Sequence, residues 1–149
     1  MSLKRGEEKV QISHKLVRLG PEDARRVAAI MRKADPEWWG DVKAKDRRES
    51  LKKVYWLGIK EGGKIAAIGN TRFVDFGSNI GIIATDKRYR NRGYATSIVS
   101  ALVREILKTS PVALIHVVSD NGPAVRAYSK VGYKPRKRYL FIRGEKIKK

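Results

Sequence analysis

The sequence predicts an α/β (α+β) fold, with one mixed, mostly antiparallel sheet of six to seven strands flanked by about four helices. Short apolar runs bounded by Gly, Pro and Asp alternate with segments whose apolar residues recur every three to four positions. Three strand-like runs follow one another between residues 54 and 85, separated only by short turns. After residue 85 helices and strands alternate, which indicates a mixed sheet in one domain.

The first third of the chain is predicted to be mostly helical. Residues 14–19 alternate like a short strand, and residues 21–34 form a helix because Pro21 suits a first turn. Asp35-Pro36 ends that helix. Two segments then precede the main strands, namely a loop at Trp38-Trp39-Gly40 and a basic helix at 44–53.

The remaining elements follow from periodicity and turn residues. Glu61 to Lys64 is predicted to be a hairpin turn between two strands. The predicted strands are 54–60, 64–75, 79–85, 112–118 and 139–143, and the predicted helices are 93–108 and 121–131. Residues 112–118 are almost wholly apolar, as expected of a strand that is covered on both faces.

Composition limits the functional classes. The chain has 149 residues, about one ordinary domain, so we expect a single domain over 1–149 with flexible tails at 1–13 and 144–149. It has no Cys, which excludes disulfides, thiolate zinc sites and a Cys nucleophile. No apolar run reaches the roughly 20 residues of a membrane span. We expect a cytoplasmic protein, a monomer or homodimer, without a membrane or metal site.

The net charge is extreme. Lys and Arg number 34 against 15 Asp and Glu, which makes +19. Such a field attracts polyanions, so a weak association with nucleic acid or another polyanion is one interpretation. The other is a host whose proteins are rich in charged residues, since these make up 33% of the chain. The sequence leaves both open.

A basic loop joins the strand at 79–85 to the next helix. The first turn of a helix carries unpaired N–H groups and a partial positive charge, which suit a diphosphate where small side chains allow close approach. Gly93 and Ala95 permit that approach, and Arg90 and Arg92 add charged donors. Taken alone, the segment also fits a solvated basic loop.

A second motif follows the strand at 112–118. Asn121 can cap the next helix, and Ala124 and Tyr128 share one face of it because they lie four apart. Gly132-Tyr133 ends the helix and returns the chain to the sheet.

Together the two segments resemble the GNAT N-acetyltransferase superfamily. The family pattern Arg/Gln-x-x-Gly-x-Gly/Ala is matched by the segment from Arg90 to Ala95. The pattern Asn-x-x-Ala-x-x-x-Tyr-x-x-x-Gly-Phe/Tyr is matched by the segment from Asn121 to Tyr133. The resemblance spans about residues 54–142. It implies transfer of an acetyl group from acetyl-CoA to a primary amine.

The resemblance also implies a cofactor site. The family's fourth and fifth strands, here 79–85 and 112–118, splay apart around the pantetheine arm of CoA. The backbone of 83–85 would pair with that arm, N–H groups of 90–96 would hold the diphosphate, and Lys130 or Arg126 would meet the adenosine 3′-phosphate. The implied binding residues are Ile83, Ala84, Thr85, Arg90, Asn91, Arg92, Gly93, Tyr94, Ala95, Thr96, Asn121, Ala124, Tyr128 and Lys130.

The resemblance assigns Tyr128 as proton donor to the CoA sulfur. A phenol with a pKa near 10 is protonated at neutral pH, although a tyrosine packed on the sheet is the alternative. Where many relatives carry a Glu on the fourth strand, this chain has Gly81 and Ile82. The sequence does not decide the identity of the general base. The candidates are a water molecule and three residues, Asp75, Asp86 and His116. Of these, His116 lies in an apolar run and fits a structural histidine.

The acceptor is less constrained. Trp38 and Trp39 fit either an acceptor pocket or core packing, and Trp56 is a third candidate of the same kind. No cluster of carboxylates indicates a polyamine pocket, so we expect a protein or peptide N-terminus, a lysine or a small amine. Two other functions remain, a nucleic-acid- or ribosome-binding protein and a non-catalytic acyl-CoA sensor on the same fold.

Overall fold

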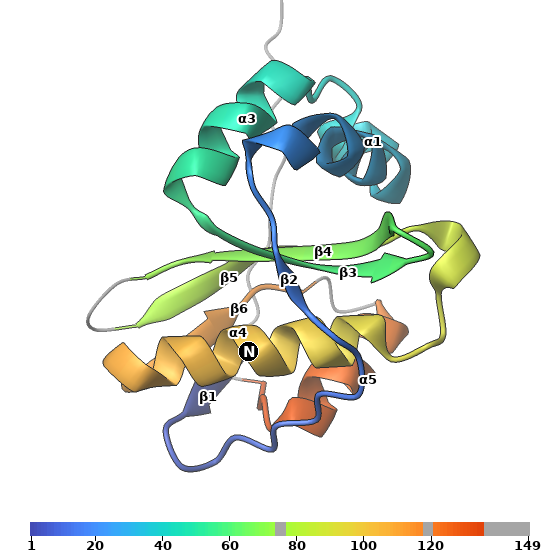
Figure 1. Ribbon diagram of the computed structural model, residues 1–149. Helices are drawn as coiled ribbons and strands as arrows, with labels where there is room; N and C mark the ends of the chain where they lie inside the picture. Colours follow the sequence, from blue (N-terminus) through green and yellow to red (C-terminus); the bar gives the residue numbers. More distant parts are fainter. Residues whose placement is uncertain (74–76, 118–120, 136–149) are drawn as a thin grey trace, which may run out of the picture.

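The computed structural model describes residues 1–73, 77–117 and 121–135. They form a six-stranded sheet in the order β1-β6-β5-β4-β3-β2, with helices on both faces (Figure 1). The strands are β1 Ser2–Lys4, β2 Val17–Arg18, β3 Tyr55–Glu61, β4 Lys64–Arg72, β5 Ser78–Thr85 and β6 Val112–Ile115. The helices are η1 Pro21–Asp23, α1 Ala24–Ala34, α2 Pro36–Trp39, α3 Ala44–Lys53, η2 Lys87–Tyr89, α4 Tyr94–Thr109 and α5 Gly122–Val131. This confirms the predicted fold class.

Each face of the sheet has its own apolar core. Helices α1 and α3 cover one face, and α4 and α5 cover the other (Figure 1). On the first face Trp56 is fully buried, and its indole N–H donates to Ser50 Oγ at 3.1 Å. The packing interpretation of Trp56 is therefore confirmed. On the second face α4 supplies the centre of the core through Ile98, Leu102 and Ile106.

Strands β5 and β6 part after three residue pairs. Their parallel ladder joins Ser78–Ile80 to residues 113–115. Beyond Ile80, β5 keeps its antiparallel pairing with β4 as far as Thr85 but has no ladder with β6. The predicted splaying of these two strands is confirmed.

A β-bulge lies where the two strands part. The β4–β5 register joins Thr71 to Ile80 but Gly69 to Ile83, so Gly81 and Ile82 both stand opposite Asn70. The Ile82 N–H donates to Asn70 Oδ1 at 2.8 Å. A Cβ at Gly81 would lie 2.6 Å from that oxygen, so glycine leaves room for this contact. Bulges of this kind re-aim a strand and end its pairing.

The expectation of a flexible tail at 1–13 is wrong. Strand β1 pairs with β6, and Leu3 is fully buried. Further along, the N–H groups of Gln11 and Ser13 donate to hydroxyls of α4, at 3.0 Å to Ser100 Oγ and 3.1 Å to Ser97 Oγ. Three strand residues are too few to show an alternating pattern, which is why β1 was not predicted.

The elements around Trp38 and at 14–19 also differ from the prediction. Residues 36–39 form helix α2 instead of a loop, because Pro36 starts a new helix and Asp35 caps it by accepting the Trp38 N–H at 3.0 Å. Of the strand expected at 14–19, only Val17–Arg18 is paired. The strand expected at 139–143, the tail at 144–149 and residue 118 lie outside the described residues.

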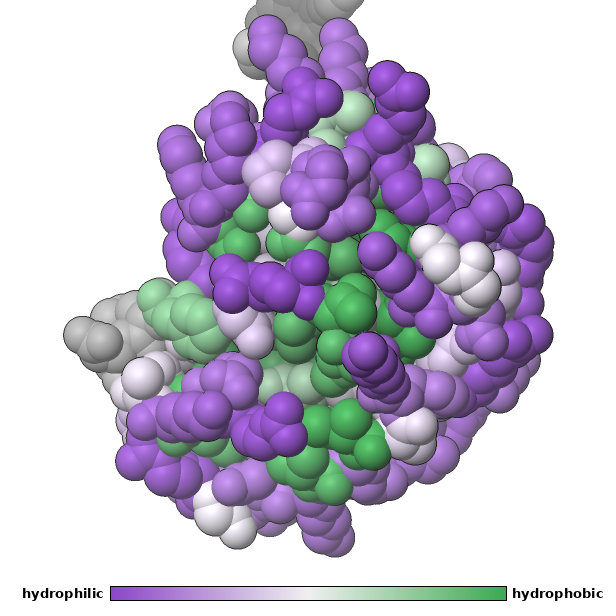
Figure 2. All heavy atoms as spheres, viewed as in Figure 1, coloured by the Kyte–Doolittle hydropathy of each residue, from purple (hydrophilic) through white to green (hydrophobic). Residues whose placement is uncertain are grey.

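The surface is mostly polar on the face shown in Figure 2. Hydrophilic residues cover the helices above and below, and hydrophobic residues gather in a band at the level of the sheet between them. Within 1–73, 77–117 and 121–135, no helix combines the length and apolarity needed to cross a membrane.

Gly69 sets how closely α4 approaches the bulge. A Cβ there would lie 2.8 Å from Ile83 Cδ1 and closer still to Ile98 of α4. We expect Gly69→Ala to lower the free energy of unfolding by about 1–3 kcal/mol, since overpacking a core forces strain. Gly77→Ala is the control, because its Cβ would meet its nearest neighbours at 3.9 Å. Urea denaturation measures both, and equal stability of the two variants would contradict this packing.

Candidate active site

The open edge of β5 is the first component of the site. Past Ile80, strand β5 pairs with β4, and within the described residues its other edge forms no ladder with β6. The predicted binding residues Ile83, Ala84 and Thr85 occupy this stretch. Backbone groups along such an edge can pair with an extended ligand, as they would with another strand.

The loop between β5 and α4 is the second component. Asn91 and Gly93 have positive φ angles of 65° and 79°, and Gly93 is the N-cap of α4 without a side-chain cap. The first-turn N–H groups of this helix are therefore left for a ligand. Arg90 and Arg92 are exposed in the same loop, and Ala95 and Thr96 follow in the first turn of the helix.

Asp86 anchors the start of this loop. Its N–H donates to Ala66 O at 2.8 Å, and its carboxylate accepts from Arg88 N–H at 3.0 Å and from Arg26 Nη2 at 2.6 Å. Asp86 is only 8% exposed. The hydrogen bonds from Arg88 first, and from Arg26, hold the pKa of Asp86 far below its ordinary value. The hypothesis that Asp86 is the general base is therefore wrong. Its carboxylate is a weak proton acceptor and is already hydrogen-bonded to two arginines.

A second carboxylate braces the other end of the loop. Glu61 accepts a hydrogen bond from the Tyr94 hydroxyl and lies 3.7 Å from Arg92 Nη1. The bond to Glu61 is the main reason that the pKa of Tyr94 is raised. Tyr94, a predicted binding residue, thus has a buried side chain that supports the loop, and only its backbone faces a ligand at the helix start.

His14 also contacts this end of the loop, through Arg92 and Tyr94, and the sequence did not predict these contacts. Its Nε2 lies 2.7 Å from Arg92 O and donates to it, and its ring packs edge-on against Tyr94 at 4.5 Å between centroids. In the sequence, 78 positions separate His14 from Arg92. No local pattern signals a contact of this length.

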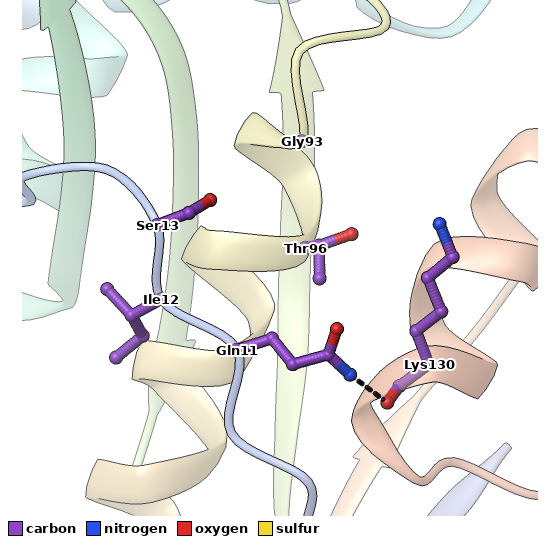
Figure 3. A pocket seen from close by; sticks show the side chains of 6 residues that line it. All are labelled: Gln11, Ile12, Ser13, Gly93, Thr96 and Lys130. Carbon is purple, nitrogen blue, oxygen red and sulfur yellow. Dashed lines mark hydrogen bonds between the residues drawn. The ribbon is translucent and has the colours of Figure 1, made fainter.

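A cavity of about 300 Å³ connects the two motifs (Figure 3). Thr96 on α4 and Lys130 on α5 lie on facing sides of it, with Gly93 at the start of α4. The third wall is the N-terminal segment of Gln11, Ile12 and Ser13. The Gln11 amide donates to Lys130 O at 2.6 Å, which ties this wall to α5. The fold therefore brings three predicted binding residues together and adds three that sequence reasoning missed.

Helix α5 holds the remaining predicted residues. Asn121 caps it by accepting the Ala124 N–H at 3.3 Å, as expected. Tyr128 is buried, and burial raises its pKa to about 12, so the phenol stays protonated over the neutral range. Its ring lies 6.3 Å from that of Tyr133, whose buried hydroxyl has no hydrogen-bond partner in the described part of the chain.

His116 lies where β5 and β6 part. It follows the last residue of β6, and its side chain is exposed although it lies in an apolar run of the sequence. Its Nδ1 is 3.4 Å from Nδ2 of Asn79 on β5. Asp75, the other candidate base, lies outside the described residues. Among the residues described, no group of three or more His, Cys, Asp or Glu could hold a metal ion.

Solved structures of acetyltransferases share this fold. A protein assigned to the GNAT acetyltransferases, from Novosphingobium aromaticivorans, is 20% identical with a TM-score of 0.72; the match covers 91% of this chain and 58% of that one. The ribosomal-protein-S18-alanine N-acetyltransferase from Escherichia coli is 19% identical with a TM-score of 0.70, covering 83% and 79%. AAC(6′)-Iy, bound to the bisubstrate analogue CoA-S-monomethyl-acetylneamine, is 13% identical with a TM-score of 0.70, covering 88% and 97%. No curated protein matches this sequence.

The fold is the one that these acetyltransferase structures share. Three local features accompany it in this chain, namely the parted strands β5 and β6, the helix start at Gly93 without a side-chain cap, and the Asn121 cap of α5. A family model described as FR47-like protein matches residues 56–142, more than half of the chain. The chain belongs to the FR47-like family.

Removing the Asp86 charge should loosen the loop. We expect Asp86→Asn to lower the free energy of unfolding at pH 7 by about 1.5–3 kcal/mol, the usual value of hydrogen bonds to a charged group. Because the folded-state pKa is lowered, this contribution is present above the ordinary pKa near 3.8 and is lost as the pH falls toward the folded-state pKa.

Urea denaturation between pH 7 and 3 measures this difference. The gap between wild type and Asp86→Asn should shrink as the pH falls below 4, given the ordinary pKa of about 3.8. Glu49→Gln removes an exposed ion pair to Lys52 and should change stability by less than about 0.5 kcal/mol. A gap that is constant with pH would contradict the anchoring role.

Proposed function

We propose that this protein is an N-acetyltransferase that transfers the acetyl group of acetyl-CoA to a primary amine. The observation that carries the proposal is the parting of β5 and β6 after Ile80. The FR47-like membership supports it. So does AAC(6′)-Iy, a structural neighbour that is bound to a CoA-derived bisubstrate analogue.

The residues present fit CoA. The open edge of β5 at 83–85 offers backbone donors and acceptors to the pantetheine arm, and the α4 start from Gly93 offers N–H groups to the diphosphate. Lys130 lies across the cavity from Thr96 and in this proposal meets the adenosine 3′-phosphate. The N-terminal segment Gln11–Ser13 closes this end of the site.

The transfer itself needs two things from the chain. CoA supplies an activated thioester. The backbone N–H of Ile83, next to the bulge, would stabilise the negative charge that develops on the thioester oxygen; one such donor is typically worth about 3–4 kcal/mol. Tyr128 donates its proton to the departing sulfur, and its pKa of about 12 keeps that proton available throughout the neutral range.

The described strands at the opening carry no acidic side chain. Strands β5 and β6, which flank the opening, and β4, which pairs with β5, contain no Asp or Glu within their bounds. With a net charge of +19, such a site attracts a polycation such as an aminoglycoside poorly. We favour a peptide or protein amine, a substrate class also named for the Escherichia coli neighbour.

Tyr128→Phe tests the catalytic assignment. We expect kcat to fall by about 10²–10⁴-fold, the usual contribution of general acid catalysis, while CoA still raises the melting temperature as in wild type. Steady-state assays with acetyl-CoA and an amine panel, combined with CoA titration by calorimetry, measure both effects. Wild type that binds CoA without turnover would indicate a sensor, and binding of polyanions but not CoA would contradict the whole proposal.

Lys130→Ala tests the cofactor end of the site. Loss of one phosphate contact should weaken CoA binding by about tenfold, equivalent to about 1.4 kcal/mol. Dephospho-CoA, which lacks the 3′-phosphate, should bind both proteins equally. Lys108→Ala is the control, since Lys108 pairs with Glu105 at the far end of α4. If Lys130→Ala weakened the binding of CoA and of dephospho-CoA equally, Lys130 would not be the residue that contacts the 3′-phosphate.

A further inference from the structure

We propose that His14 is a positioning residue for the cofactor, because its hydrogen bond to Arg92 O fixes the backbone that receives the diphosphate of CoA. This inference rests on the proposed function. It adds a residue from outside 56–142, the region that the family model matches.

The contact between His14 and the loop sets the direction of one N–H group. His14 Nε2 lies 2.7 Å from Arg92 O, and a carbonyl oxygen can only accept, so Nε2 carries the proton. In a planar trans peptide the C=O and N–H groups point in opposite directions, and the described chain contains no cis peptide. Holding Arg92 O therefore also orients the N–H of Gly93, one of the groups expected to hold the diphosphate.

The loop needs such support because its backbone adopts an uncommon conformation. Asn91 and Gly93, on either side of Arg92, have φ angles of 65° and 79° in the left-handed region. A residue other than glycine adopts this region only at a cost in free energy. The ion pair of Arg92 with Glu61, at 3.7 Å, restrains a side chain. The hydrogen bond from His14 instead acts on the backbone, between the two left-handed residues.

His14 belongs to a segment that crosses α4. Strands β1 and β2 are the two edges of the sheet, and residues 5–16 join them across the face that carries α4 and α5 (Figure 1). We call residues 5–16 the crossing segment. Its Lys9 N–H donates to Val131 O at 2.8 Å, which ties the segment to α5 before it reaches α4.

Two buried hydroxyls of α4 hold the crossing segment just before His14. Gln11 N–H donates to Ser100 Oγ at 3.0 Å. Ser13 N–H donates to Ser97 Oγ at 3.1 Å, and both of these α4 serines are fully buried. The helix whose first turn is expected to receive the diphosphate thus also supplies the two acceptors that place His14 beside that turn.

The ring of His14 has a packing role that must be separated from its hydrogen bond. It lies edge-on against Tyr94, the first residue of α4, at 4.5 Å between centroids. Truncation to alanine would remove the packing and the hydrogen bond together. A substitution that keeps an aromatic ring but has no donor separates the two roles.

The expected effect depends on the ligand. A loop already held in its binding conformation loses less entropy when a ligand binds to it. Acetyl-CoA carries the diphosphate that would reach this loop, whereas S-acetylpantetheine has the same thioester and no phosphate. A merely structural role for His14 would affect both acetyl donors alike, and a positioning role would affect acetyl-CoA alone.

His14→Phe is the main test, because it keeps a ring and removes the donor. We expect the KM for acetyl-CoA and the Kd for CoA to rise about 3–10-fold, the usual effect of one hydrogen bond, with little change in kcat. The rise in KM should be absent with S-acetylpantetheine. Steady-state assays with an alanine-initiated peptide, and calorimetry with CoA, measure these values.

His14→Gln is the matched variant, because its side-chain amide can donate to Arg92 O. It should restore most of the affinity for CoA, and since glutamine is uncharged, rescue would assign the effect to the hydrogen bond and not to positive charge on the imidazole. In wild type with nitrogen-labelled histidine, the ring signals of His14 should shift when CoA is added but not when pantetheine is added. This measurement tests the coupling even if a variant fails to fold.

The outcomes separate this inference from the proposed function. Three results would each overturn the inference alone while wild type still acetylates amines: equal losses for both acetyl donors, a His14→Gln variant as weak as His14→Phe, or ring signals that do not respond to CoA. An unchanged KM for acetyl-CoA in folded His14→Phe would do the same. Wild type that binds no CoA would contradict the proposed function and the inference together.

Discussion

The length of the ladder between β5 and β6 determines how the site is arranged. Three residue pairs hold the two strands together, and the bulge at Gly81 and Ile82 then redirects β5. Pairing with β4 continues, so the redirected strand loses little backbone hydrogen bonding. In chain order α4 follows β5, and α5 follows β6. One local register shift thus leaves an open strand edge on β5 shortly before the start of α4, which has no side-chain cap.

Features encoded within a few residues could be predicted from the sequence. Gly93 at a left-handed helix start and Asn121 as a helix cap are local signals, and the structure contains both. Features that depend on distant residues could not. Asp86 was one of the candidates for the general base because its partner Arg26 lies 60 positions away and gives no local sign of its presence. The contact of His14 with Arg92 and the role of Glu61 beneath the loop could not be predicted either, because they also join residues that lie far apart in the sequence.

The basic loop is more ordered than its composition suggests. Two carboxylates, Asp86 and Glu61, hold Arg88 and Arg92 at its two ends. Such pairing lowers the net positive charge of the loop, but it fixes the backbone that presents the α4 N–H groups. A ligand that binds there meets donors already in place and avoids part of the entropic cost of ordering them. The attraction of a diphosphate to this loop then depends more on backbone geometry than on the total of +19.

The pairing of β1 with β6 also bears on how the chain folds. Met1 and Ile115 exchange backbone hydrogen bonds across 114 positions, so this edge closes a loop of almost the whole described chain. Closing so long a loop costs entropy that only late-forming contacts can repay. Strand β6 must therefore settle against β5 before β1 can add to its outer side. Residues 2–4 are therefore among the last of the described residues to find their place.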